Sequence, residues 1–356
     1  IDSICQAHGL TVGKFMSPCI LDVHDQIQIN GIPINEQELD FIFELFARSG
    51  LSGMLTDFEL LTCAAFKHFE RNNVDIALIE TGMGGLYDST NVVTPIVSII
   101  TSIALEHTNF LGDTIPQIAS HKAGIIKKGC PVLFGGNSKE ALEVISEKAN
   151  SKIFTVDYSN LSNISCTLSG STFNFGEQNF SLSMLGIYQP YNAAIAISAV
   201  EILRKNGLDI SDKAVYEGLK STRLNGRFEL IKENPIVIFD GSHNPHGVNA
   251  AIESIKNYFD GKVVLLMGVM ADKEYPEMVK TLSEVAAKAF TVKPKNPRAL
   301  DSMLLADEFI RNGVDAEFST ELSAGVEKAL TYAEKHQLPL IALGSLYMYS
   351  EFMNFI

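Results

Sequence analysis

Buried strands alternate with helices through the first part of the chain, and this alternation limits the possible folds more than any other feature. Apolar runs lie at about 75–80, 95–103 and 131–134, with helical patterns near 114–127 and 138–149. Consecutive parallel strands require such crossover helices, and the crossovers are right-handed. The pattern therefore predicts an α/β fold with a parallel sheet covered by helices.

A second, shorter series of strands and helices follows a turn with the sequence RLNGRFE at 223–229. Residues 151–185 are rich in Ser, Asn and Thr with short alternations, which predict a small antiparallel ribbon. A chain of 356 residues exceeds what one core usually supports. We predict two domains, a larger one over 1–226 and a smaller doubly wound α/β domain over 227–356.

Charge and cysteine usage exclude several classes of protein. The 42 acidic and 28 basic residues give a formal charge of −14, which argues against nucleic-acid partners and against a polybasic membrane surface. Five cysteines without a C-x-x-C pair indicate reduced thiols rather than a disulfide framework. No apolar run reaches the roughly 18 residues expected of a membrane helix. We predict a soluble cytoplasmic protein.

Ionisable side chains follow two of the predicted strands. Glu80 ends the run DIALIE, and His107 follows the run PIVSIITSIAL. Ligands bind at the carboxyl ends of strands in open α/β sheets. With the hydroxyls of Ser17 and Thr81 nearby, these groups suit a Mg²⁺ that also contacts substrate phosphates. The alternatives are an ordinary glycine turn after Glu80 and a structural or surface histidine.

Lys122 lies in a predicted helix among Ala119, Ala123 and Ile126. Most helical lysines reach solvent. A desolvated lysine, in contrast, can lose its proton and become chemically useful. Both interpretations remain open from the residues alone.

The segment IVIFDGSHNPHG places Asp240 at a strand end and His243 in a loop before a helix. Asp240 could serve only as a helix cap. Arg227 could form a surface ion pair or bind an anion. Basic residues concentrate at Lys273, Lys293, Lys295 and Arg298, which favours an anion site in this acidic chain.

A series of short segments matches one known family in the same order over essentially the whole chain. The segments are MSPCI, INGIPI, LTDFELLTCAAF, ETGMGGLYDSTN, SIALEHTNFLG, HKAGIIKKG, QPYNAAIA, LNGRFE, FDGSHNPHG, ADKEY, NPRAL and LGSLY. They resemble folylpolyglutamate synthetases and bifunctional dihydrofolate synthetases of the Mur ligase superfamily. The resemblance implies a Mur-ligase-like ATP-binding domain followed by a glutamate-ligase-like domain.

The resemblance also implies roles for individual residues. Lys122, as a carbamate, and His243 are expected to be catalytic. The expected magnesium ligands, for one or two ions, are Ser17, Glu80 and His107. The expected ATP-binding residues are Asn192, Arg227 and Asp240. The expected folate or pteroate pocket is formed by Thr56, Asp57, Phe58, Glu59, Tyr87, Asp88 and Ser89.

The implied activity is that of a monomeric carbon-nitrogen ligase. ATP would phosphorylate the terminal carboxylate of a folate, and also of dihydropteroate if both are substrates, and the amino group of L-glutamate would attack the acyl phosphate. Two alternatives stay open: a ligase of the same superfamily that acts on cell-wall precursors, and a non-catalytic folate-binding paralogue.

The chain departs from the family pattern at several positions. The phosphate loop, which resembles G-T-N-G-K-G-S, is absent, and we expect the given chain to begin inside the helix that follows this loop. Cys19 replaces a common His, Leu86 a common Arg and His121 a common Glu, and DVHDQI replaces a segment that usually contains Glu-Arg. These departures concern the folate side and therefore the range of substrates.

Overall fold

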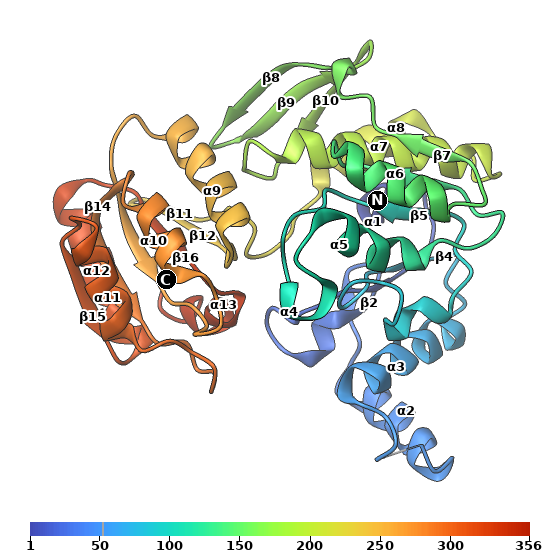
Figure 1. Ribbon diagram of the computed structural model, residues 1–356, viewed down its shortest axis with the longest axis horizontal. Helices are drawn as coiled ribbons and strands as arrows, with labels where there is room; N and C mark the ends of the chain where they lie inside the picture. The colour runs from blue at the N-terminus through green and yellow to red at the C-terminus, as the bar shows by residue number, and fades with distance from the viewer. Residues whose placement is uncertain (52) are drawn as a thin grey trace. The chain divides into compact units, whose positions relative to one another are not determined.

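The computed structural model describes residues 1–51 and 53–356 (Figure 1). The chain forms two compact units that interleave along the sequence. Unit 1 comprises 1–161 and 191–221, and unit 2 comprises 162–190 and 222–356. The domain boundary predicted at 226/227 stays a prediction.

The first sheet of unit 1 has the strand order β3-β2-β1-β4. β1 (Val12–Phe15) pairs in parallel with β4 (Ile76–Ile79) and antiparallel with β2 (Ile27–Ile29), which pairs with β3 (Ile32–Pro33). Between β3 and β4 the chain forms the helices α2 (Glu36–Arg48) and α3 (Asp57–Arg71). Their apolar faces cover a core of Phe15, Ile27, Leu39, Ile42, Ala65 and Phe69.

The second sheet of unit 1 is parallel, with the order β5-β6-β7. β5 (Ser98–Ile100), β6 (Val132–Phe134) and β7 (Ile153–Thr155) alternate with α5 (Ile115–Lys122) and α6 (Lys139–Lys148). Assigning 151–155 to the predicted ribbon was wrong, because β7 pairs residue by residue with β6. β5 is also shorter than the run 95–103, so His107 does not follow the strand directly.

Three further helices, α1, α7 and α8, belong wholly or mainly to unit 1. α1 (Asp2–Ala7) contacts α8 (Asp212–Ser221), and a Cβ at Gly218 of α8 would lie only 2.4 Å from Ile4 Cα. α7 (Gln189–Lys205) begins at the boundary between the units, with all but its first two residues in unit 1. Its small and apolar side chains Ala194, Ala199 and Val200 are completely buried.

Unit 2 is built on a six-stranded sheet with the order β11-β12-β16-β13-β14-β15. The strands are β11 (Glu229–Glu233), β12 (Ile236–Asp240), β13 (Val263–Met267), β14 (Ala286–Val292), β15 (Ala316–Ser319) and β16 (Leu340–Leu343), and only β11 is antiparallel. The helices are α9 (Pro245–Tyr258), α10 (Tyr275–Leu282), α11 (Ser302–Arg311), α12 (Leu322–His336) and α13 (Tyr349–Phe352). α10 ends at Leu282, and the chain continues as β14 from Ala286.

The predicted antiparallel ribbon is present as β8 (Leu161–Thr167), β9 (Gly170–Phe175) and β10 (Gln178–Leu182). Contacts with α9 attach it to unit 2: Asn257 Nδ2 donates to Cys166 O over 3.2 Å, and Gly186 N donates to the Tyr258 hydroxyl over 2.9 Å. Leu185, just after the ribbon, is buried in the core of this unit.

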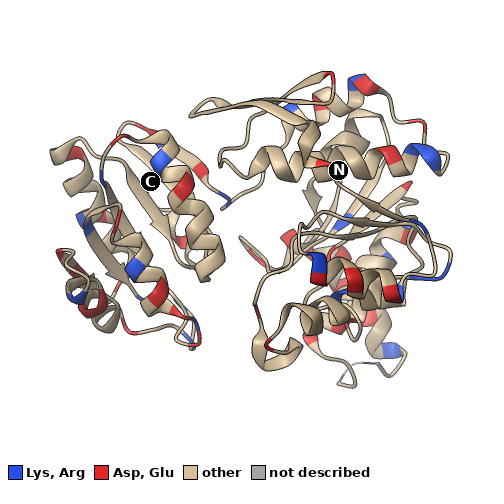
Figure 2. Cartoon of the chain, turned by 45° about the horizontal axis from the view of Figure 1, so that its top comes forward, with Lys and Arg blue, Asp and Glu red and all other residues tan. Residues whose placement is uncertain are grey.

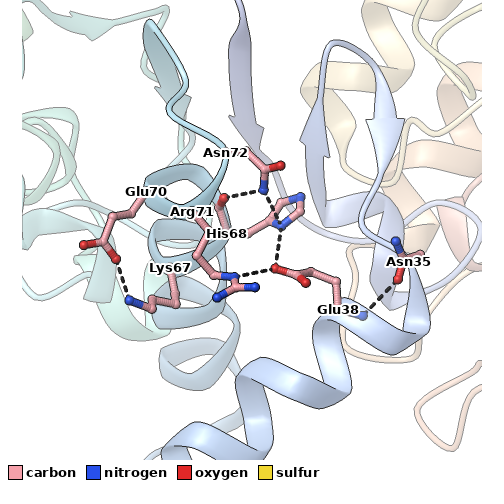
Figure 3. Close-up of polar contacts among 7 residues, drawn as sticks. All are labelled: Asn35, Glu38, Lys67, His68, Glu70, Arg71 and Asn72. Atoms are coloured by element: carbon pink, nitrogen blue, oxygen red, sulfur yellow. Dashed lines mark hydrogen bonds and ion pairs between the residues drawn. The ribbon is translucent and has the colours of Figure 1, made fainter.

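Charged residues occur on helices and loops of both units (Figure 2). One polar cluster joins α2 to α3: Arg71 Nε donates to Glu38 Oε1 over 2.8 Å, and His68 Nδ1 lies 3.7 Å from the same oxygen (Figure 3).

None of the helices within 1–51 and 53–356 combines the length and apolarity that a membrane crossing requires.

Candidate functional site

The parallel pairing of β1 and β4 brings Ser17 and Glu80 together. Phe15 is the register partner of Ile79, so the segments that follow the two strands leave the sheet side by side. Ser17 N then donates a hydrogen bond to Glu80 Oε2 over 3.0 Å. The Glu80 residue is exposed and Ser17 is half-buried. The structure thus confirms that these two predicted residues are neighbours at the carboxyl end of the sheet.

His107 is placed differently from the expectation that it directly follows a strand. It lies before the short helix α4 (Thr108–Leu111) in the left-handed region, with φ of 52°. His107 Nε2 is 3.9 Å from Glu106 Oε1, and 42% of the His107 side chain is exposed. β5 and β4 belong to separate sheets in the described chain, so His107 and Glu80 do not follow adjacent paired strands.

The neighbouring residues Ser17 and Glu80 both carry oxygen donors that could bind a metal ion. Mg²⁺ prefers such donors and usually keeps several waters. The Glu80 carboxylate beside Ser17 fits this preference. Among the residues that the structure describes, no three His, Cys, Asp or Glu side chains gather as a metal cage.

Lys122 is the last residue of α5 and lies beside a glycine-rich loop. The helix ends here, not further along as the sequence predicted, and a 3₁₀ turn over Ala123–Ile125 follows. Lys122 is half-buried, next to the buried Ala123. Leu86 N donates to His121 O over 2.9 Å, which places the loop against the end of α5.

The glycines of the loop 80–92 allow close approach more than unusual backbone angles. A Cβ at Gly82 would lie 2.6 Å from the Phe58 ring, and one at Gly85 would lie 3.0 Å from Lys122 O. Gly84 is the one glycine among these three with positive φ, at 69°. The loop therefore contacts both α3 and α5.

The stretch Thr56 to Glu59 forms the first turn of α3. Glu59 Oε2 accepts hydrogen bonds from Thr56 N and Thr56 Oγ1 over 2.7 and 2.9 Å, which completes a capping box. These bonds hold the pKa of Glu59 below its ordinary value. Asp57 is the first helical residue, and Phe58 contacts Phe15 with ring centroids 5.6 Å apart.

Tyr87, Asp88 and Ser89 lie in the loop beside α3. The Ser89 and Thr62 hydroxyls are 3.0 Å apart. Asp88 accepts hydrogen bonds from Met83 N and Thr90 N over 2.9 and 3.0 Å, which fixes the shape of the loop. Tyr87 is 86% exposed. The segment Tyr87–Ser89 thus lies against α3, one turn beyond the stretch Thr56 to Glu59, and the pocket stays a prediction.

Asn91 was missed by sequence reasoning. Its Nδ2 donates to Leu86 O and to Gly124 O, each over 3.1 Å, and Lys127 Nζ donates to Asn91 O over 2.7 Å. By contrast, the capping box at Thr56 could have been predicted from its local Thr-x-x-Glu pattern. Nothing in the sequence alone shows that Asn91 spans two segments.

In unit 2, Asp240 is the buried last residue of β12. Only 2% of it is exposed, and its carboxylate accepts hydrogen bonds from Phe228 N over 2.8 Å and Ser242 N over 3.0 Å. Asp240 does not cap α9, because Asn244 takes that place by accepting from Gly247 N over 2.7 Å. Burial and the nearby Asp240 charge raise the pKa of Tyr188.

Arg227 and His243 lie in the two segments of unit 2 that flank β11 and β12, near Asp240. Phe228 has a positive φ of 46°, and its bond to Asp240 holds the turn that presents the half-buried Arg227. His243 Nδ1 is 2.8 Å from Gly241 O. Asn192 belongs to unit 1, as an exposed residue in the first turn of α7.

The predicted basic concentration in unit 2 is partly neutralised. Lys295 Nζ is 2.9 Å from Glu351 Oε1, and Arg298 Nη1 is 3.7 Å from Asp272 Oδ2. Two of its cations therefore have carboxylate partners, which weakens the hypothesis of a dedicated anion site.

Comparison with known proteins assigns both halves of the chain to one family. Residues 48–200 match the Mur ligase middle domain, and residues 226–345 match the Mur ligase glutamate ligase domain. The dihydrofolate synthase/folylpolyglutamate synthase of Bacillus subtilis is 34% identical, covering 99% of this chain and 85% of the relative.

Solved structures agree with this assignment. Folylpolyglutamate synthase of Mycobacterium tuberculosis, complexed with ADP and AMPPCP, has a TM-score of 0.89 and 25% identity, with 98% of this chain and 85% of that chain covered. E. coli FolC in complex with DHPP and ADP has a TM-score of 0.85 and 27% identity, with 99% and 83% covered. This chain belongs to the Mur ligase family, among the folylpolyglutamate and dihydrofolate synthases.

Proposed function

We propose that this protein joins L-glutamate to the terminal carboxylate of a folate at the expense of ATP. One structural observation carries the proposal: the loop 80–92 joins Glu80, the segment Tyr87–Ser89 and the end of α5 at Lys122 within unit 1. Family membership supplies the reaction type, because the matched relatives are named as folylpolyglutamate and dihydrofolate synthases.

The reaction requires activation of a carboxylate. A carboxylate oxygen of the folate attacks the γ-phosphorus of ATP, which releases ADP and forms an acyl phosphate. The neutral amino group of glutamate then attacks the acyl carbon, loses a proton and displaces phosphate to form the amide. No covalent bond to the protein is needed.

Ser17, Glu80 and His107 would hold Mg²⁺, as one ion or as part of a pair. The neighbouring Ser17 and Glu80 would fit a hydrated ion, because both carry oxygen donors and Glu80 lies at the surface. When bound, the ion neutralises charge on the transferring phosphoryl group.

Lys122 would act as a carbamate. Its amine, once deprotonated, adds to CO₂ and releases a proton, so that a cation becomes an anionic oxygen ligand. The half-buried place of Lys122 at the end of α5 supports this role, because the loop that carries Glu80 contacts the α5 backbone there.

Arg227, Asp240 and Asn192 would bind the nucleotide. Arg227 offers planar donors suited to phosphate oxygens. The buried Asp240 accepts a hydrogen bond from Phe228 N. This bond supports a role for Asp240 in nucleotide binding, because it fixes the turn that carries Arg227. If Nδ1 of His243 donates to Gly241 O, Nε2 is the nitrogen that can accept the proton lost by the glutamate amine.

The first turn of α3 and the segment Tyr87–Ser89 would line the folate pocket. The hydrogen bond between Thr62, in the next turn of α3, and Ser89 joins the helix to this segment. The exposed Tyr87 ring offers a stacking surface for a pterin or a benzoyl group. We further propose that the protein acts as a monomer in the cytoplasm, with reduced cysteines.

The test is an assay of the full-length protein with ATP, Mg²⁺, tetrahydrofolate and glutamate. We expect ADP release that depends on both folate and glutamate, and a folate product that is heavier by one glutamyl residue. ADP release with a uridine-linked peptide precursor, but not with tetrahydrofolate, would identify a cell-wall ligase instead. Folate binding without ADP release from any substrate would identify a non-catalytic paralogue.

A further inference from the structure

Two backbone segments of unit 1 touch with no side chain between them. A Cβ at Gly124 would lie 2.3 Å from Leu86 Cα and 2.7 Å from Leu86 N, a separation that only glycine permits. Leu86 N donates to His121 O over 2.9 Å on the same side. The glycine-rich loop and the end of α5 are therefore built as one close-packed pair.

Two carbonyl groups of this pair point to a common donor. Leu86 O belongs to the loop and Gly124 O to the turn after Lys122, and each accepts a hydrogen bond from Asn91 Nδ2 over 3.1 Å. A primary amide has two N–H bonds on one nitrogen, so it can join two acceptors. A carboxylate in its place would face both carbonyls with oxygen.

Asn91 is itself fixed by a third contact. Lys127 Nζ donates to Asn91 O over 2.7 Å, from the chain just beyond the 3₁₀ turn. Asn91 also ends a turn, because its N–H donates to Asp88 O over 2.9 Å. Backbone and side chain of Asn91 therefore both take part in the junction.

We infer that Asn91 is a positioning residue for the ligation reaction, whose amide sets the distance between the segment Tyr87–Ser89 and Lys122. Tyr87 directly follows Leu86, and Lys122 lies two positions before Gly124. The inference rests on the proposed function, because it assigns these two segments to the folate and to the reacting centre. Asn91 itself need not touch a substrate.

This geometry predicts which kinetic constants depend on Asn91. Loss of both hydrogen bonds lets the loop move relative to Lys122, which misaligns the folate carboxylate. The nucleotide-binding candidates Asn192, Arg227 and Asp240 lie on other elements. We expect kcat/KM for folate to fall about tenfold or more, while KM for ATP changes less than about twofold.

The experiment uses the full-length protein with Asn91→Asp and Asn91→Ala. Asn206→Asp is the matched control, because Asn206 Nδ2 donates a 2.8 Å bond only within the region of its own helix, to Ile202 O. Steady-state kinetics are combined with hydrogen exchange of the peptides covering 83–92 and 121–127. We expect faster exchange in both peptides for the Asn91 variants, and wild-type values for Asn206→Asp.

The outcomes separate the inference from the proposed function. Wild-type folate kcat/KM in Asn91→Asp would overturn the inference, and so would faster exchange throughout unit 1, which indicates general unfolding. A wild-type protein without ligase activity would overturn the proposed function. In that case the exchange comparison still decides whether Asn91 joins the two segments.

Discussion

Ser17 N and the Glu80 carboxylate are joined by a 3.0 Å hydrogen bond at the end of two parallel strands. Both residues lie just past paired strand ends, so the sheet itself fixes their separation. An exposed carboxylate that is oriented by such a hydrogen bond can bind a ligand while it keeps its position. The bond explains how a loop residue can be positioned with the precision of a strand.

Glu80→Ala should therefore lower kcat on the order of a hundredfold, since the side chain would hold the ion that assists phosphoryl transfer. Stability should change little, because Glu80 is exposed. Turnover at saturating Mg²⁺ and the thermal midpoint measure the two effects. Near-normal turnover would refute the metal role, and a collapsed midpoint would show that Glu80 is structural.

Lys122→Ala should abolish ligation while leaving α5 intact, because alanine is the best helix former and Lys122 is only half-buried. The carbamate is detectable by ¹³C NMR after equilibration with ¹³CO₂. We expect one carbamate resonance in the wild type that is missing from Lys122→Ala. An active Ala variant, or a wild type without that resonance, would contradict the role.

Acid should weaken the contact between α2 and α3 through His68. Burial lowers the pKa of His68 below its ordinary value, and the Arg71 charge acts in the same direction, while Glu38 opposes both. An unfolded chain then binds the proton more readily, so stability is present above about pH 6.5 and is lost as the pH falls towards the lowered pKa.

His68→Gln should remove this part of the pH dependence. Chemical unfolding of unit 1 between pH 5 and 8 measures it. His24, whose side chain is 28% exposed and lies beside the Asp22 carboxylate, is the control histidine. A wild-type slope that survives in His68→Gln, or that has the opposite sign, would show that another group is responsible.

Lys288 should stabilise the edge of the sheet in unit 2. Its Nζ lies 2.6 Å from Glu317 Oε1 and 2.9 Å from Asp315 Oδ2, while only 11% of its side chain is exposed. The ring centroids of Phe290 and Tyr332 lie 5.5 and 5.3 Å from the charged Nζ of Lys288. Lys288→Ala should lower the free energy of unfolding by about 1–3 kcal/mol.

Lys256→Ala is the control for that measurement, because the Lys256–Glu284 pair is exposed on both sides. Urea unfolding should show a much smaller change for it. Equal effects of the two substitutions would mean that burial adds nothing to the Lys288 contacts.

Periodicity and motif order predicted the two α/β series, the ribbon and most helices, because those features depend on local patterns. Strand ends were harder to predict. Apolar runs continue beyond Ile100, and β7 has a composition close to that of the ribbon, so only the pairing with β6 distinguishes it. Sequence reasoning also extended the helix beyond Lys122, although a 3₁₀ turn begins there.

The candidate site was predicted as residue types more than as contacts. The neighbours Ser17 and Glu80 follow from parallel strands, and the structure confirms them. The roles of Gly85 and Gly124 as points of close approach depend on contacts between distant segments, and so does the bridge from Asn91 to Gly124, which lies 33 residues further along the chain. Such long-range contacts leave no local pattern in one sequence.

Substrate range should depend on Leu86, which departs from the Arg that the family resemblance leads us to expect at this position. The backbone of Leu86 is fixed through its N–H by His121 O and through its carbonyl by Asn91 Nδ2, while its residue is 39% exposed. A substitution there changes the chemistry beside the folate loop with little movement of the backbone. An arginine would add a donor for an anionic group.

Dihydropteroate is smaller than a folate and has fewer remote contacts to compensate for a missing donor. The wild type should therefore use tetrahydrofolate efficiently and dihydropteroate poorly, and Leu86→Arg should raise kcat/KM for dihydropteroate about tenfold. Ile32→Arg, at a residue that is 72% exposed on β3, is the control for added charge. Comparable wild-type kcat/KM values for the two substrates would instead establish a bifunctional enzyme, and an unchanged ratio in Leu86→Arg would show that specificity is set elsewhere in the pocket.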